Sequence, residues 1–177
     1  MEYRAATPDD AAAIARLHAD SWRIAYRGMY SDEYLDGPVF EERLAVWTQR
    51  LAELGPAQFT VIADDGGTLA GFAHTFADLD PVWGSYLENL HAAPDRKGEG
   101  IGTRLMAETA AWADANTASR ILYLFVLEKN TPAQHFYEAV GGEHIDNEIR
   151  TGADGSPNTA LRYVWRDLHV LSQLRPA

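Results

Sequence analysis

The sequence has no cysteine, few basic residues and no long apolar run. Without cysteine, disulfides, thiolate nucleophiles and cysteine-based zinc sites are excluded. Lysine and arginine together number 15 against 26 acidic residues, which gives a formal net charge of −11. Proteins that bind nucleic acids neutralise phosphates with clustered Lys and Arg, so we expect no nucleic-acid partner. The charge favours a cationic acceptor only slightly, because an acidic surface mostly serves solubility.

No segment has the length and apolar character of a membrane span. The longest apolar run, Ile121 to Leu127, is far shorter than the roughly 20 residues that a spanning helix needs. The start of the chain, Met1 to Ala5, lacks a basic region followed by an apolar stretch. We therefore expect a cytoplasmic protein with no membrane partner. The six histidines show no His-x-x-x-His or His-Glu-x-x-His spacing, so we expect no metal.

The length and the 46% apolar content suit one folded unit, so we expect a single domain over residues 1–177. Apolar periodicity, capping residues and Gly/Pro punctuation predict a strand, two helices, three strands, a helix, a strand, a helix and two strands. The expected strands are 2–6, 58–63, 68–77, 86–92, 121–127, 143–150 and 159–165, and the expected helices are 7–22, about 40–51, about 102–116 and about 131–140. Residues 78–85 are expected to form a loop. This order indicates a mixed α/β sheet and not a doubly wound one.

A glycine-rich turn precedes the third expected helix, with the sequence Lys97-Gly98-Glu99-Gly100-Ile101-Gly102-Thr103. Alternate glycines let successive N–H groups point into one concavity, and the helix start adds free N–H groups and a partial positive charge. A phosphate fits such a cup, to which the Thr103 hydroxyl would add a donor. A dinucleotide fingerprint would need glycine at 103 or 105, and a P-loop would need a Gly-Lys-Ser/Thr triplet. From the spacing alone, a phosphate site and an ordinary strand-to-helix turn both remain open.

This segment resembles the acetyl-CoA signature of the GNAT superfamily of N-acyltransferases, Gln/Arg-x-x-Gly-x-Gly/Ala, with Lys97 in place of the usual Gln or Arg. The resemblance continues through residues 87–92, 126–137 and 161–163, and the order of elements agrees. It implies an α/β (α+β) fold: a mixed, mostly antiparallel central sheet of about six or seven strands, with helices on both faces. It also implies a V-shaped splay between the fourth and fifth strands.

The resemblance further implies acetyl-CoA as co-substrate, without a metal. The pantetheine arm would pair with the exposed edge of the strand before the glycine turn, much as a peptide adds to a sheet edge. The diphosphate would lie on the amides of the turn, and the helix after Asn130 would form the other wall. The cofactor-binding residues implied in this way are Leu90, His91, Ala92, Lys97, Gly98, Gly100, Ile101, Gly102, Thr103, Asn130, Ala133 and Phe136.

The chemistry calls for a base, since only about one lysine-type amine in 10³ is neutral at pH 7 and reaching that form costs about 4 to 5 kcal/mol. The resemblance points to Glu88, on the strand that would carry the thioester, acting directly or through a water. An exposed strand carboxylate without a catalytic role is the competing interpretation. His91, His74 and Glu99 are the fallback candidates. By strand alternation, His91 should face away from Glu88 and Leu90.

Aromatic residues complete the expected site. The resemblance points to Tyr137 as the O–H donor that stabilises the departing thiolate, against a purely structural core tyrosine. Trp22, Tyr26 and Tyr30 lie in a Trp-x-x-x-Tyr-x-Gly run that shapes the acceptor pocket in several GNAT enzymes, although core packing is the alternative for Trp22. Trp83, in a Pro/Gly-containing loop, is expected at the pocket rim or on a partner surface.

The function expected from these residues is N-acetyl transfer from acetyl-CoA directly to a primary amine through a ternary complex. The amine could belong to a small molecule or to a peptide or protein. No acyl-enzyme is expected, since the chain has neither cysteine nor a Gly-x-Ser-x-Gly motif. The alternatives are a catalytically idle CoA-binding sensor and, more remotely, a nucleotide-binding module. The oligomeric state, including a homodimer, stays open.

Overall fold

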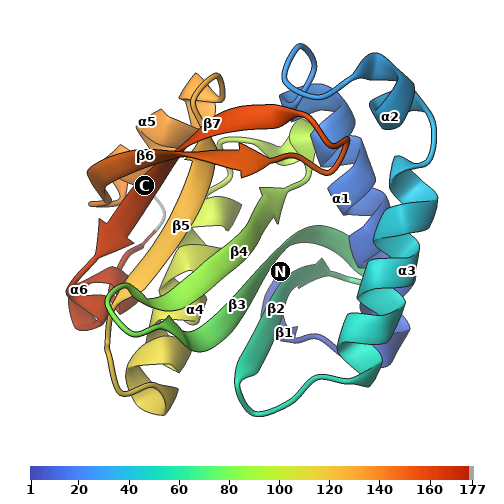
Figure 1. Cartoon of the computed structure of the whole chain (residues 1–177). Helices are drawn as coiled ribbons and strands as arrows, with labels where there is room; N and C mark the ends of the chain where they lie inside the picture. The colour runs from blue at the N-terminus through green and yellow to red at the C-terminus, as the bar shows by residue number, and fades with distance from the viewer. Residues whose placement is uncertain (176–177) are drawn as a thin grey trace.

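The computed structural model describes residues 1–175, and within them seven strands form one sheet in the order β1-β2-β3-β4-β5-β7-β6 (Figure 1). Neighbouring strands are antiparallel except β4 and β5, which are parallel. The strands are β1 (Glu2–Ala5), β2 (Gln58–Asp65), β3 (Thr68–Asp80), β4 (Gly84–Ala92), β5 (Leu122–Leu127), β6 (Glu143–Thr151) and β7 (Pro157–Trp165).

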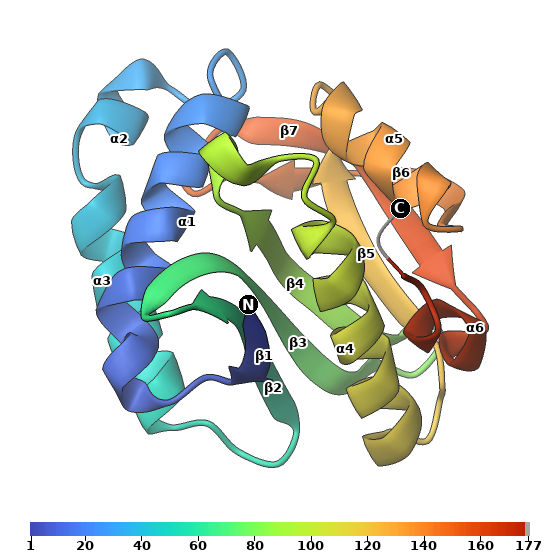
Figure 2. The ribbon, with the colours of Figure 1, turned by 180° about the vertical axis from the view of Figure 1, so that it is seen from behind.

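Helices cover both faces of the sheet. They are α1 (Ala11–Ala25), α2 (Asp32–Asp36), α3 (Val39–Ala52), α4 (Ile101–Asn116), α5 (Thr131–Ala139) and α6 (Leu168–Ser172), with 3₁₀ turns at Pro8–Asp10 and Pro94–Arg96. On one face, α1 and α3 pack against Ile62 and Phe72, whereas α4, α5 and α6 enclose Val61 and Ala73 on the other. Successive side chains of a strand point to opposite faces, so β2 and β3 serve both layers. Figures 1 and 2 show these two layers from the front and the back. The expected fold class is confirmed.

The connection between β3 and β4 differs from expectation. The segment 78–85 was expected as a loop, but β3 runs to Asp80 and β4 starts at Gly84, so only a tight turn lies between them. The Asp80 carboxylate accepts hydrogen bonds from the amides of Val82 and Trp83, at 2.8 and 2.9 Å. Gly84 then takes a positive φ of 78°, which suits glycine. The Asp80 side chain stabilises this turn. Residues 78–85 themselves lack the alternating apolar pattern by which strands are usually recognised.

The two parallel strands separate soon after they meet. Only Ser85↔Leu122 and Tyr86↔Tyr123 are paired between β4 and β5. From Leu87 to Ala92, β4 keeps its pairing with β3 but has no strand partner on its β5 side. The splay expected between the fourth and fifth strands is therefore present. It leaves an unpaired strand edge directed at the gap.

Candidate active site

A bulge in β4 decides where Glu88 points. His74 pairs with Asn89 and Thr75 pairs with Leu87, so Glu88 is an extra residue that no β3 residue opposes. The bulge interrupts the alternation. Leu87 and Leu90 both pack in the core cluster beneath α4, whereas Glu88 contacts α3 on the opposite face.

His91 also lies on the α1/α3 face, with its ring centroid 4.7 Å from that of His18. The alternation argument was therefore right for His91 and Leu90 but wrong for Glu88. A bulge shifts the residue pattern by one position, which a strict period of two does not anticipate.

The Glu88 carboxylate is held by two neighbours. Its Oε2 accepts hydrogen bonds from Arg50 Nη1 at 2.5 Å and from Asn89 Nδ2 at 2.7 Å. The Glu88 side chain remains 32% exposed, against 17% for Arg50. The contact fixes one oxygen of the carboxylate and leaves solvent access to the group.

A cavity of about 490 Å³ fills the gap between β4, β5 and the glycine turn, and we call it the larger cavity. It is lined by every residue that the resemblance assigned to the cofactor, together with Glu88 and Tyr137. The structure brings these residues together: Leu90, His91, Ala92, Lys97, Gly98, Gly100, Ile101, Gly102, Thr103, Asn130, Ala133 and Phe136.

The glycine turn presents a row of main-chain donors to the larger cavity. Gly98 and Gly100 have φ of 90° and 75°, a left-handed conformation that an L side chain rarely adopts. The first amide that closes a helical hydrogen bond is that of Arg104, which donates to the Gly100 carbonyl at 3.0 Å. Within residues 1–175, the amides of Gly98, Gly100 and residues 101–103 donate to no other group. These donors and the α4 N-terminus fit a phosphate-sized anion.

The opposite wall of the larger cavity comes from α5. Asn130 caps this helix, its side chain accepting from the Ala133 amide at 3.4 Å. A Cβ on Gly102 would lie 3.2 Å from the Phe136 ring, so the glycine lets α4 and α5 approach closely. Tyr137 is 9% exposed, and burial raises the pKa of its hydroxyl, which keeps it protonated at neutral pH. In the described part of the chain its Oη has no hydrogen-bond partner.

A second cavity of about 320 Å³ borders the first, and we call it the smaller cavity. Tyr26, Glu88, His91 and Phe125 line both cavities, so the two meet at these residues. The smaller cavity is further lined by Trp22, Tyr30, Arg43, Val46, Arg50, Tyr86, Asn89, Leu127, Arg150, Thr151, Gly152 and Ala160.

Three of the four aromatics expected around an acceptor lie together at the smaller cavity. The ring centroids of Trp22, Tyr26 and Tyr30 are 5.0 to 5.6 Å apart. Trp22 is only 8% exposed, so it both packs in the core and reaches the cavity wall. Aromatic walls of this kind accommodate the apolar part of a small ligand.

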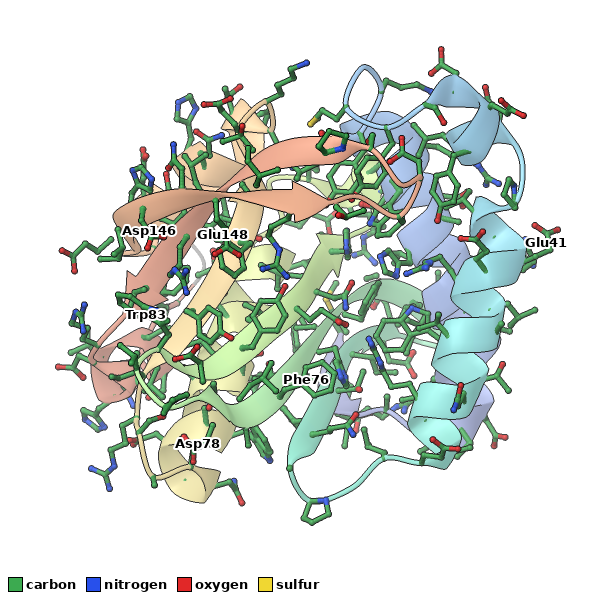
Figure 3. All side chains as sticks on the ribbon, viewed as in Figure 1. Glu41, Phe76, Asp78, Trp83, Asp146 and Glu148 are labelled. Atoms are coloured by element: carbon green, nitrogen blue, oxygen red, sulfur yellow. The ribbon has the colours of Figure 1, made fainter. Side chains whose placement is uncertain are left out.

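Trp83 lies elsewhere. It lies in the β3–β4 turn, where the Arg162 guanidinium is 4.9 Å from the centre of its ring, and it lines neither cavity. In Figure 3 it lies on the side of the molecule away from α3. The expected place at a pocket rim is therefore not supported for Trp83, and a partner surface stays a prediction.

The fallback bases differ in their access to the cavities. His91 lines both, with Nδ1 2.9 Å from Ser21 Oγ, and burial lowers its pKa to about 4. His74 is fully buried and Glu99 is paired with Arg96 at 2.7 Å, and neither lines a cavity. Among Glu88, His91, His74 and Glu99, only Glu88 and His91 border both cavities, and Glu88 is the carboxylate of the two.

Sequence reasoning missed the arginines of the smaller cavity, Arg43, Arg50 and Arg150. Arg43 and Arg50 are seven residues apart on α3, close to two turns, and therefore share a helix face. Trp47, also on α3, is fully buried, so the spacing could have placed both arginines beside the core. Arg150 stands near the end of β6, and no local pattern distinguishes it.

Residues 1–175 contain no helix long and apolar enough to cross a membrane. In the same range, no three His, Asp or Glu side chains are grouped so that they could hold a metal ion.

Comparison with known proteins identifies the family. Residues 14–141 match the model of the acetyltransferase (GNAT) family, which is more than half of the chain. The chain belongs to the GNAT family. The expected enzyme class, an acetyl-CoA-dependent acyltransferase, is thereby confirmed at the level of the family.

Individual GNAT proteins resemble this chain over most of its length. It is 28% identical over 174 residues to the uncharacterized N-acetyltransferase YuaI of Bacillus subtilis, covering 97% of this chain and 96% of the relative. It is 34% identical over 115 residues to an aminoglycoside N(6')-acetyltransferase type 1 of Stenotrophomonas maltophilia, covering 62% and 65%. The structure of yncA from Salmonella typhimurium, with its cofactor acetyl-CoA, superposes with a TM-score of 0.67 at 16% identity, covering 100% and 96%. At that identity the likeness concerns the fold.

Proposed function

We propose that this GNAT enzyme transfers the acetyl group of acetyl-CoA directly to a primary amine while both substrates are bound. One observation carries the proposal: the larger and smaller cavities meet at Glu88. A thioester in the first cavity and an amine in the second would therefore face each other across this residue. Holding both reactants in one place removes most of the entropic cost of a bimolecular reaction.

Acetyl-CoA fits the larger cavity by the chemistry of its walls. The free amides of the glycine turn suit the diphosphate, and the unpaired edge of β4 suits the amide groups of pantetheine. Arg96 is already bound to Asp65 and Glu99, whereas Lys97 forms no ion pair within residues 1–175. We assign to Lys97 the cation that closes over the diphosphate, the place where the family usually has Gln or Arg.

The chemistry assigns distinct roles to two side chains. Acetyl-CoA supplies an activated thioester carbonyl. Glu88 accepts the proton of the amine, directly or through a water, as the nitrogen–carbon bond forms. Tyr137 donates its hydroxyl proton to the sulfur as the carbon–sulfur bond breaks. Burial raises the pKa of Tyr137, so its hydroxyl is still protonated when the thiolate forms. Glu88 then releases its proton to solvent and Tyr137 takes one up, so both groups return to their starting states.

The experiment that tests the proposal is acetyl transfer to a panel of amines. We expect release of free CoA thiol and an N-acetylated product, detected by mass spectrometry, with at least one class among small amines, amino acids, aminoglycosides and peptides. Tight CoA binding without thiol release from any of them would instead support the idle sensor. If ATP displaced bound CoA as effectively as free CoA does, that result would support a nucleotide-binding module.

The role of Tyr137 has a sharper test. Tyr137→Phe should lower kcat by about 100-fold while leaving CoA affinity and thermal stability close to those of the parent protein, because loss of one proton donor typically costs 10²- to 10³-fold. Tyr123→Phe is the matched control, since Tyr123 is 6% exposed and lines neither cavity. Full activity of Tyr137→Phe would exclude the hydroxyl as the donor.

A further inference from the structure

The smaller cavity is positively charged in a protein whose net charge is −11. Three arginines line it, Arg43, Arg50 and Arg150, and Glu88 is the one carboxylate among the described residues of its wall. The histidine in its wall, His91, has its pKa lowered to about 4 by burial and is neutral at pH 7. The local charge therefore has the opposite sign to the surface as a whole.

Two of these arginines already have partners. Arg50 donates to Glu88 at 2.5 Å, and Arg150 donates to Glu148 at 2.6 Å. Arg43 differs from both, because it forms no ion pair and no side-chain hydrogen bond with any of residues 1–175. Its guanidinium stacks 4.7 Å from the centre of the Trp22 ring, and its Nε is buried without an acceptor.

An unpaired guanidinium in a cavity wall requires an explanation. Leaving a buried donor unsatisfied costs about 1 to 3 kcal/mol, and more when the group is charged. The planar fork of arginine matches the two oxygens of a carboxylate or phosphate. Stacking on Trp22 fixes the plane of the Arg43 fork before a ligand arrives, so the group is already oriented for an oxyanion.

This anion would not be a phosphate of CoA. Arg43 lines only the smaller cavity, whereas the glycine turn lines only the larger one. Arg43 also lies two turns from Arg50 on α3, which is roughly 10 Å along the helix axis. Because Arg50 holds Glu88 at the junction, Arg43 is a residue of the acceptor cavity that lies apart from the Arg50–Glu88 pair.

We propose that the acceptor is an amine that also carries an oxyanion, a carboxylate or a phosphate, and that Arg43 binds this oxyanion while the amine lies at Glu88. The inference rests on the proposed function for the identity of the smaller cavity. It selects amino acids and similar zwitterions over the polycationic acceptors that the overall charge would favour. Arg43 then sets specificity, since a neutral or cationic end group would leave the guanidinium unpaired.

The first test compares ligands on the unaltered protein. Isothermal titration calorimetry with CoA-saturated protein would measure binding of glycine, β-alanine, 4-aminobutyrate and 5-aminopentanoate, each beside its carboxamide. The amide keeps the size and removes the charge. Aminoalkylphosphonates of the same lengths distinguish a phosphate-type from a carboxylate-type acceptor. We expect the best anionic amine to bind about 10- to 100-fold more tightly than its neutral counterpart, the range for a charge-assisted pair.

The second test changes Arg43. Arg43→Gln should remove the preference for the anionic ligand and leave CoA affinity and the binding of the carboxamide unchanged. Arg43→Lys should restore part of the preference, because it keeps the charge but loses the fork. Arg16→Gln is the matched control, since Arg16 also stacks on an aromatic ring, 5.3 Å from that of Phe40, but lines neither cavity.

The outcomes separate the inference from the proposed function. Equal binding of each anionic amine and its carboxamide, absence of binding by all the anionic amines, or a preference that survives Arg43→Gln would overturn the inference. Anionic amines that bind through Arg43 but are never acetylated would support the site and contradict the acetyl-transfer proposal. Acetylation of neutral amines alone would support the acetyl-transfer proposal and contradict the anion site at Arg43.

Discussion

The larger and smaller cavities touch at Glu88 but are built from different parts of the chain. The larger one contains the main-chain amides and small residues of the glycine turn, with side chains of α1, β4, β5 and α5 around them. The smaller one is formed largely by long aromatic and charged side chains, most of them from α1, α3, β4, β5 and β6. A main-chain site depends on a short run of residues, whereas a side-chain site depends on the whole fold. The first therefore suits a shared co-substrate, and the second is free to vary with the acceptor.

The largest effect should come from the main chain of the larger cavity. Gly100→Glu places a side chain at φ 75° and a carboxylate among amides that we assign to the diphosphate. We expect CoA affinity, measured by calorimetry, to fall by more than about 100-fold, since both charge repulsion and the lost main-chain shape oppose binding.

The matched control for this change is Gly155→Glu. Gly155 has a φ of 81° and open space around its Cα, but it lies in the turn between β6 and β7, outside both cavities. Both variants should lose about 1 to 2 kcal/mol of folding free energy from the left-handed residue. Unchanged CoA affinity in Gly100→Glu, or an equal loss in Gly155→Glu, would contradict the assignment of the glycine turn.

A smaller effect is expected at the junction. Glu88→Gln should lower kcat by about 100-fold, within the range for loss of a general base, and leave CoA affinity intact. The loss should be greatest at low pH, where the fewest acceptor amines are neutral. Steady-state rates between pH 6 and 9 measure both features.

Glu99→Gln provides the control for the junction, because Glu99 is a carboxylate within the glycine turn whose side chain is paired with Arg96 and which lines neither cavity. It should retain the parent kcat. If Glu88→Gln weakens CoA binding instead of kcat, the Arg50–Glu88 pair supports the shape of the larger cavity and Glu88 is not the base.

The same contrast explains what the sequence could predict. The larger cavity follows a local pattern. The residues from Lys97 to Thr103 and from Asn130 to Phe136 could therefore be assigned through their resemblance to the GNAT family, whereas the glycine spacing alone left an ordinary turn open. The order and position of the strands also followed from periodicity and turn residues. The short helices α2 and α6 were not predicted, and two local features of the sheet also escaped. The β3–β4 turn is capped by Asp80, and the bulge at Glu88 reverses the face that alternation predicts.

The smaller cavity could not be predicted in the same way. Arg43 and Arg150 are distant in the chain, and the fold places both at one cavity, Arg43 from α3 and Arg150 from β6. Nothing in the residues around Arg150 distinguishes it from a surface arginine. The aromatic run containing Trp22 was recognised only through resemblance. Trp83 was expected at a pocket rim or a partner surface because it lies in a Pro/Gly-containing loop, and it lines neither cavity. Net charge averages over the whole surface, so it could not predict that three arginines line this cavity.

The smallest expected effect concerns the wall behind the smaller cavity. His74 is fully buried, its Nδ1 lies 2.7 Å from Thr60 Oγ1, and its ring contacts Trp47, on which Arg50 stacks. Burial and the Arg50 cation lower the pKa of His74 to about 3. In the unfolded chain its pKa returns to about 6.5. The glycine turn, Lys97 to Thr103, contains no histidine. Acidification should therefore affect the side of the molecule that holds His74.

The sign of the effect follows from proton binding. Below pH 6.5 the unfolded chain binds a proton at His74 and the folded protein does not, until the pH approaches 3. The stabilisation is therefore complete above pH 6.5 and decreases as the pH falls, by at most about 1.4 kcal/mol per pH unit. Urea unfolding at pH 7 and pH 5 should show this loss, and His74→Gln should reduce it by about 2 kcal/mol. His169→Gln, at an exposed position on α6, should leave the loss unchanged. An equal pH dependence in all three proteins would mean that His74 binds its proton as readily in the folded protein as in the unfolded chain, which would contradict a lowered pKa in the wall behind Arg50.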